Sequence, residues 1–334
     1  MANIFSFATS ELSQDAMLCW LLQLAAPEET LHPLHEVGTR FVNFLYICCD
    51  KKLPGEIQRC QVIKQDGHID VQCQINSQDV ILIEDKVGTK QHSDQLRRYQ
   101  EQLQHSGLTI LPVYIQTGDQ CDYSEVISNG YSVVCRKDLL AFFASCNDLR
   151  AKYHSDLLED YVSFLSEIEA DVQSYKKLPI SQWKWNSWKG FYSELKKQLA
   201  EGGWDYVSNP SGGFLGFWWH WSCVDECEHY LQLEQERLCF KICTDVTERQ
   251  SEFKYKYHDL FISQSQNTDI RLIKPSRLRS GTYMTVAILD AEYRVCDDNG
   301  IIDMDKTVAF LRKVMGFKDA VVKICEENNK DGQE

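Results

Sequence analysis

The segment VILIEDKVGTKQHSDQLRRY, residues 80–99, joins an apolar strand to three charged residues and then to a helical segment. Residues 80–83 are apolar on both faces, which predicts a strand in the interior of a sheet. Side chains alternate along a strand, so Glu84 and Lys86 share a face with Val80 and Leu82. Unpaired charges are costly to bury. We therefore expect a functional site where this strand leaves the core.

The preceding segment HIDVQCQI places a further acid, Asp70, in a mostly apolar strand. A hairpin between the two strands brings Asp70 close to Glu84, and two adjacent carboxylates repel unless a cation lies between them. These oxygens and the backbone carbonyl of Asp85 suit Mg²⁺ or Mn²⁺. Lys86 can position or deprotonate a water, or neutralise charge on a phosphate. Together these groups predict metal-dependent hydrolysis of phosphodiester bonds.

The pattern of Asp70 followed by Glu84-Asp85-Lys86 resembles the signature of the PD-(D/E)XK nuclease superfamily. Gln95 and Tyr99 match the Gln-x-x-x-Tyr element of its RecB-like and lambda-exonuclease-like branches. In those branches an N-terminal helix supplies a further glutamate, and the matching residue is Glu11.

The resemblance covers roughly residues 5–150 and implies a restriction-endonuclease-like fold. It also implies DNA as substrate, a role in microbial repair, restriction or anti-phage defence, and action beside a partner ATPase. Asp70 and Glu84 would bind metal, with Glu11 completing the site, and Gln95 and Tyr99 would support it. The family proline before the first acid is absent, since Ile69 stands there.

Simpler interpretations of the same residues remain open. Glu84 and Lys86 also fit an ion pair at a strand end, with Asp70 as a hydrogen-bonded core acid. Glu11 and Asp15 lie four residues apart, so either also fits a helix cap or a surface acid. The rival function is a binding or regulatory subunit that keeps a nuclease fold without cleaving.

The pattern of elements predicts an α/β domain over residues 1–178, with a mixed sheet flanked by helices. The expected strands are Ile57–Ile63, His68–Ile75, Val80–Asp85, Leu108–Ile115 and Tyr131–Cys135. The expected helices are 10–24, 34–50, 93–105, 137–146 and 154–175. Residues 179–334 predict an accessory α+β domain with an antiparallel sheet, a helix over 185–199 and a final helix near 306–315 that Asp303 or Asp305 caps.

The formal net charge of −14 argues against a protein that coats nucleic acid. A polyanion would have to meet a local basic strip. One strip contains Lys86, Lys90, Arg97 and Arg98, and another contains Arg271, Lys274, Arg277 and Arg279. We expect Lys90 and the second strip to bind nucleic acid, while solvated surface charge or partner docking is the alternative.

Seven of the eight tryptophans lie between Trp183 and Trp221. Such a cluster is typical of a hydrophobic core, and the alternative is that it provides platforms on which unpaired bases stack. Strand alternation predicts Phe217, Trp219 and Trp221 on one face and Trp218 on the other. Cys223, Cys227, Cys239 and Cys243 do not have the spacing of a zinc site, and Cys239 and Cys243 share one strand face, as core thiols would.

No apolar run reaches the length of about 18 residues that a membrane helix needs. The N-terminus lacks a basic leader, and acids interrupt its only apolar segment. The 14 cysteines are scattered, which is typical of reduced thiols. We therefore expect a cytoplasmic protein that is not inserted in a membrane.

Overall fold

The computed structural model describes residues 2–66, 69–91, 94–104, 107–210 and 212–331. It divides into two compact units, Met1–Ala170 and Asp171–Glu334. The division falls eight residues before the predicted boundary at 178, within helix α7 (Asp156–Gln173). The predicted strand beginning at residue 68 and the predicted helix over 93–105 have end residues, 68, 93 and 105, that lie outside the described residues.

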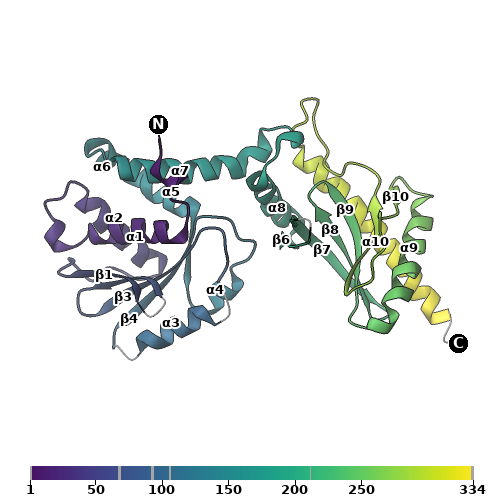
Figure 1. Cartoon of the computed structure of the whole chain (residues 1–334), viewed down its shortest axis with the longest axis horizontal. Helices are drawn as coiled ribbons and strands as arrows, with labels where there is room; N and C mark the ends of the chain where they lie inside the picture. The colour runs from purple at the N-terminus through teal and green to yellow at the C-terminus, as the bar shows by residue number, and fades with distance from the viewer. Residues whose placement is uncertain (1, 67–68, 92–93, 105–106, 211, 332–334) are drawn as a thin grey trace. The chain divides into compact units, whose positions relative to one another are not determined.

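The N-terminal unit contains a five-stranded sheet with helices on both faces (Figure 1). Its strands are β1 (Cys60–Asp66), β2 (Ile69–Ile75), β3 (Asp79–Lys86), β4 (Thr109–Gln116) and β5 (Ser132–Cys135), adjacent in that order. Its helices are α1 (Glu11–Gln23), α2 (His35–Cys48), α3 (Gln95–Gln104), α4 (Ser124–Ser128), α5 (Arg136–Ser145), α6 (Asn147–Lys152) and α7. The first three strands are antiparallel and the last three parallel, so the predicted mixed sheet is confirmed.

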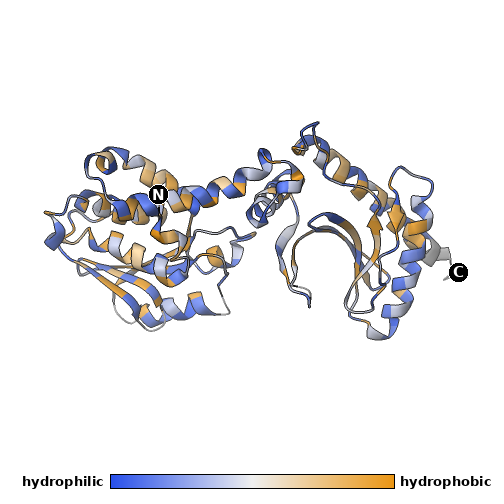
Figure 2. Cartoon of the chain, turned by 45° about the horizontal axis from the view of Figure 1, so that its top comes forward, coloured by the Kyte–Doolittle hydropathy of each residue, from blue (hydrophilic) through white to orange (hydrophobic). Residues whose placement is uncertain are grey.

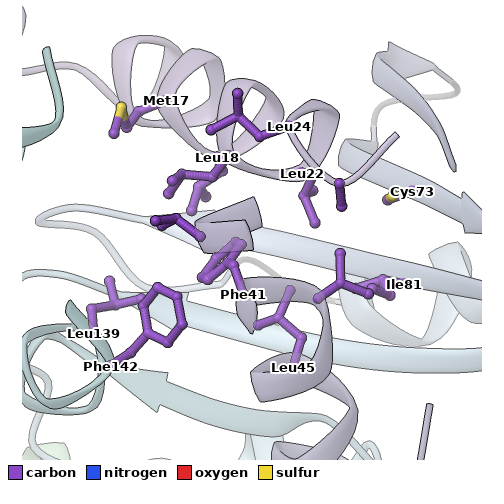
Figure 3. Close-up of a cluster of buried hydrophobic side chains, with 14 of the residues drawn as sticks. Met17, Leu18, Leu22, Leu24, Phe41, Leu45, Cys73, Ile81, Leu139 and Phe142 are labelled. Atoms are coloured by element: carbon purple, nitrogen blue, oxygen red, sulfur yellow. The ribbon is translucent and has the colours of Figure 1, made fainter. Parts of the chain in front are cut away.

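Strand β3 lies at the centre of this sheet, and all eight of its residues are buried. Ile81 and Ile83 pack into a core built with α1, α2, α5 and α7, part of which Figure 3 shows around Phe41. Leu82 points to the other face, where α3 and α4 cover the sheet. A strand covered on both faces is rigid, which fixes the position of the charged residues at its end.

Two predictions for this unit were wrong in detail. The strand expected from Ile57 begins at Cys60, because the side-chain oxygen of Asn76 accepts hydrogen bonds from the amides of Gln58 and Arg59. These amides are thereby taken out of the strand ladder. Helices α4 and α6 were not predicted, since five and six residues are too few to show a helical period.

The C-terminal unit contains a six-stranded sheet that is antiparallel throughout, as predicted. Its strands, in spatial order, are β10 (Leu272–Ile273), β11 (Tyr283–Leu289), β9 (Arg237–Cys243), β8 (Cys227–Glu234), β7 (Phe214–Val224) and β6 (Gly203–Val207). Its helices are α8 (Trp185–Leu199), α9 (Gln250–Ser265) and α10 (Met304–Asp331). Both hydrophilic and hydrophobic residues lie along the strands of the two sheets (Figure 2).

Helices α8, α9 and α10 cover one face of this sheet. The ring of Phe217 on β7 lies 5.5 Å from that of Tyr192 on α8, and Phe240 on β9 contacts Phe261 on α9 and Phe317 on α10. The alternate residues of the same strands therefore face away from the helices.

Two helices of this unit differ from the predictions. Helix α9 was not predicted, although Phe253, Tyr257 and Phe261 recur at helical spacing and are buried. The final helix was predicted to end near residue 315 but continues to Asp331, with Asp303 accepting a hydrogen bond from the amide of Lys306 at its start. Across the described ranges, no helix combines the length and apolar character needed to cross a membrane.

Replacing Phe41 by alanine tests the role of the core in Figure 3. Phe41 is fully buried, so the Phe41→Ala variant should lose about 3–5 kcal/mol of unfolding free energy in the N-terminal unit. Urea-dependent hydrogen exchange, read by mass spectrometry on peptides from this unit, measures the loss. Leu31→Ala, at a side chain 97% exposed, is the control and should change little. Equal losses in the two variants would contradict the assigned core.

Candidate active site at the end of strand β3

The six residues predicted to form a catalytic site come from four elements that meet at the end of β3. Asp70 lies on β2, and Glu84 and Lys86 lie on β3. The pairing of Val71 with Ile83, continued by one residue, puts Asp70 opposite Glu84, as the predicted hairpin requires. Glu11 begins α1, and Gln95 and Tyr99 lie on the first turns of α3.

The ammonium group of Lys86 is the centre of this cluster. It forms an ion pair with Glu84, and its Nζ lies 3.7 Å from Asp70 Oδ2 and 3.9 Å from Glu11 Oε2. The same Nζ donates a hydrogen bond of 3.0 Å to the backbone carbonyl of Asp85. The oxygens predicted to bind a metal therefore all face one positive centre.

Glu84 is the most deeply buried member of the cluster. Burial, and then the nearby carboxylate of Asp70, raise the pKa of Glu84 to about 8. Its Oε2 accepts no hydrogen bond from the described residues. A nearby cation would stabilise the ionised form of this carboxyl group, because it offsets both the cost of burying the charge and the repulsion from Asp70.

Lys86 keeps its proton despite its burial. Burial lowers the pKa of Lys86, but Glu84, Asp70 and Glu11 outweigh this effect, and the net shift is upward. The residue therefore acts as a cation and a hydrogen-bond donor in this arrangement.

The exposed edge of the cluster consists of Asp70 and Glu11, whose side chains are 22% and 37% exposed. Asp70 Oδ2 accepts a hydrogen bond of 3.0 Å from the amide of Asp85, which fixes the carboxylate against β3. Glu11 Oε1 accepts one of 2.5 Å from the hydroxyl of Thr89. A ligand from solvent would reach the cluster past these two carboxylates.

Asp85 and Asp15 form a second group of acids on the opposite face of β3, which was not predicted from the sequence. Gln14 donates a hydrogen bond to Asp85 and accepts one of 2.7 Å from Thr117. Asp15 is only 1% exposed, so its interpretation as a surface acid was wrong. Burial, and then Asp70, raise the pKa of Asp15 to about 6, and burial raises that of Asp85 well above its ordinary value.

The signal for this second group was present in the sequence, since Gln14 and Asp15 follow Glu11 by about one helical turn. It was ambiguous because the burial of a helix face depends on what the helix packs against. Here α1 packs on β1, β2 and β3, which places its polar first turns over the end of the sheet.

Gln95 and Tyr99 contact each other as their spacing on α3 requires. The side-chain amide of Gln95 donates a hydrogen bond of 2.8 Å to the hydroxyl of Tyr99. The ring of Tyr99 is buried with Leu82 and Leu96, and its pKa is raised by burial and by Glu84 and Asp70. Tyr99 therefore lies near the two acids and couples α3 to the cluster.

The predicted basic residues are not gathered in one place. Lys90 is half-buried on the segment that follows β3, and Arg97 forms ion pairs with Asp94 and Glu101. In the second strip, Arg271 donates a hydrogen bond of 2.6 Å to the carbonyl of Gln266 at the end of α9. Lys274, Arg277 and Arg279 are exposed, and the two arginines line a groove described below.

The residues at the end of β3 offer oxygen atoms, the type of ligand that a divalent cation such as Mg²⁺ binds. In the part of the chain that the structure describes, no three His, Cys, Asp or Glu side chains already form a metal-ligand set. A cation here would therefore draw on the two carboxylates of Asp70 and Glu84, the carbonyl of Asp85 and water, which is the mixed shell that Mg²⁺ prefers.

Comparison of the chain with protein-family models, with curated proteins and with solved structures found no match.

Replacing Asp15 by asparagine tests the buried acids through pH. The raised pKa of Asp15 means that the folded state binds more protons than the unfolded state between about pH 4 and 6, so its carboxyl group lowers stability as pH rises through this range. Asp15→Asn removes this loss. The unfolding free energy of the variant should therefore exceed that of the native chain by an amount that approaches about 3 kcal/mol above pH 6. Urea unfolding from pH 4 to 8 measures it.

The control is Glu56→Gln, at an exposed carboxyl group in the same unit. It should leave the pH dependence unchanged. An Asp15→Asn profile parallel to that of the native chain would show that Asp15 does not titrate abnormally.

Proposed function

We propose that the N-terminal unit is a Mg²⁺- or Mn²⁺-dependent nuclease of the PD-(D/E)XK kind that hydrolyses phosphodiester bonds in DNA. The observation that supports it most directly is the convergence of Glu84, Asp70, Glu11 and the Asp85 carbonyl on the Lys86 ammonium. A structural ion pair at a strand end needs one acid for one lysine. Here a single lysine faces three carboxylates and a carbonyl oxygen.

Each residue has a role that follows from its position. Asp70 and Glu84 would hold the cation with the Asp85 carbonyl, and Glu11 would join them from α1. The bound cation supplies Lewis acidity and charge neutralisation for attack on a phosphodiester. Gln95 and Tyr99 would keep the acids in place, as the hydrogen bond between them and the burial of Tyr99 suggest.

Lys86 has a double role in this proposal. Without a cation it neutralises Glu84 and holds the Asp85 carbonyl. With a cation and substrate present, the same ammonium would stabilise negative charge on the phosphate, since its raised pKa favours the charged form. The six-residue set also fits the family resemblance, which implies a partner ATPase and a role in anti-phage defence, restriction or repair.

One observation favours the rival function, a catalytically silent binding or regulatory subunit. The direct pairing of Lys86 with Glu84 satisfies both charges without any ligand. In this alternative the nuclease fold is kept but neither metal nor substrate is processed. Metal binding and cleavage, measured separately, distinguish the two functions.

Replacing Glu84 or Lys86 tests the chemistry. Glu84→Gln and Lys86→Ala should each lower cleavage of DNA in Mg²⁺ or Mn²⁺ by at least about a hundredfold, because the first removes a carboxylate that would hold the cation and the second removes the ammonium that would face the phosphate. Tyr99→Phe should cause a smaller loss, since it removes only the hydroxyl that Gln95 contacts. Lys52→Ala, at an exposed cation of the same unit, is the control. Full activity in folded Lys86→Ala protein would exclude the mechanism.

Calorimetric titration with Mn²⁺ tests the metal site without relying on cleavage. Asp70→Asn should weaken Mn²⁺ binding by about tenfold or more, because it removes a charged oxygen from the set. The matched control Glu56→Gln should bind as the native chain does. Unchanged affinity in Asp70→Asn would place the cation elsewhere, and no binding by the native chain would favour the silent subunit.

A further inference from the structure

The C-terminal sheet has a groove of about 670 Å³ on the face opposite helices α8, α9 and α10. Ligand sites in proteins typically have volumes of about 300–1,000 Å³. The groove is lined by side chains from β6, β7, β8, β9 and β11, from the loop that follows β6 and from the loop that precedes β11. It lies wholly within the C-terminal unit, whereas the proposed nuclease residues belong to the N-terminal unit.

Strand alternation explains the composition of the groove. On β9, Phe240 and Ile242 face the helices, and Lys241 between them lines the groove. On β8, Leu231 and Leu233 are fully buried, whereas Tyr230 and Gln232 line the groove. The face away from the helices therefore carries aromatic and polar side chains together.

A bulge in β7 adds Trp221 to this face. Trp219 pairs with Leu231 and Ser222 pairs with His229, so two residues of β7 stand opposite Tyr230 alone. His220 takes up the extra length with a φ of 61°. The bulge reverses the alternation, so the prediction that Trp221 shares a face with Phe217 and Trp219 was wrong.

Lys318 on α10 holds the bulge in place. Its buried Nζ donates hydrogen bonds of 2.6 Å to the carbonyl of His220 and 2.9 Å to the hydroxyl of Ser222. A helix on the covered face thus fixes the direction of a tryptophan on the open face.

Trp221 and Tyr230 form an aromatic platform in the groove. Their rings are stacked, with centroids 4.0 Å apart and planes 10° apart. Tyr230 is 3% exposed and Trp221 is 45% exposed, so Trp221 presents indole surface to solvent. Trp218 lines the same groove. A planar ring from a ligand can extend such a stack.

The charges of the groove favour an anion. Lys241 lies 3.5 Å from Glu234, so these two groups largely neutralise each other. Arg277 and Arg279 are exposed, and within the described residues neither side chain has an ion pair or a hydrogen bond. Two available guanidinium groups beside an aromatic platform stand out in a chain with a net charge of −14.

We propose that this groove binds unpaired nucleotides of a single-stranded nucleic acid, with a base stacked on Trp221 and the phosphates paired with Arg277 and Arg279. Stacking on aromatic side chains together with a cationic rim is the arrangement that binds single strands without sequence preference. The site is independent of the nuclease proposal, because binding here needs neither the metal nor the residues at the end of β3.

The test measures binding by the full chain in EDTA, so that metal-dependent cleavage plays no part. Fluorescence anisotropy would follow labelled oligothymidylate, oligouridylate, a duplex of equal length and an abasic strand. The native chain should bind both single strands more tightly than the duplex or the abasic strand. Trp221→Ala should weaken single-strand binding by about fivefold or more and leave abasic binding unchanged, whereas Trp221→Phe should retain most of the affinity.

The double variant Arg277→Ala/Arg279→Ala tests the phosphate contacts. It should weaken binding and reduce the slope of log affinity against log salt by about 1.4, from two lost contacts. The matched control Lys177→Ala/Lys197→Ala removes the same charge from exposed positions outside the groove and should change little. Equal effects of the two double variants, equal affinity for base-containing and abasic strands, or no binding by the native chain would each overturn the proposal.

Discussion

The N-terminal unit depends on one electrostatic constraint, the placing of a single ammonium group among several acids at the end of a buried strand. Lys86 contacts Glu84, Asp70, Glu11 and the Asp85 carbonyl, and Asp15 and Asp85 add further negative charge nearby. Burial, and then the repulsion from neighbouring carboxylates that a single cation does not balance, raise the pKa values of Glu84 and Asp15.

The fold maintains this costly arrangement through β3 and α1. Strand β3 is covered on both faces, so the charged residues at its end are held in fixed positions against their neighbours. Helix α1 supplies Glu11 to one side of the strand end and Gln14 to the other. Sites at which acids are forced together are often functional, because the same field that raises a pKa also attracts a cation.

The C-terminal unit follows a different principle, in which one sheet has two unlike faces. The face toward α8, α9 and α10 is apolar, and the other carries stacked rings, a neutralised Lys241–Glu234 pair and two arginines. A tryptophan that is 45% exposed gains little from burial in the fold itself, so its place in the groove suits a ligand better than a core.

The sequence alone determined the features that depend on local pattern: the mixed and antiparallel sheets, the interior position of β3, and the meeting of Asp70, Glu84 and Lys86 through a short hairpin. Period-2 alternation and tight turns act over a few residues, so they can be read directly. Only the tertiary structure decided that Asp15 is buried and that Trp221 faces the groove. Both outcomes depend on contacts between segments distant in sequence, namely α1 against the sheet and Lys318 against the bulge 98 residues away. No local pattern reports such contacts, because burial and strand bulges are settled by what packs against them.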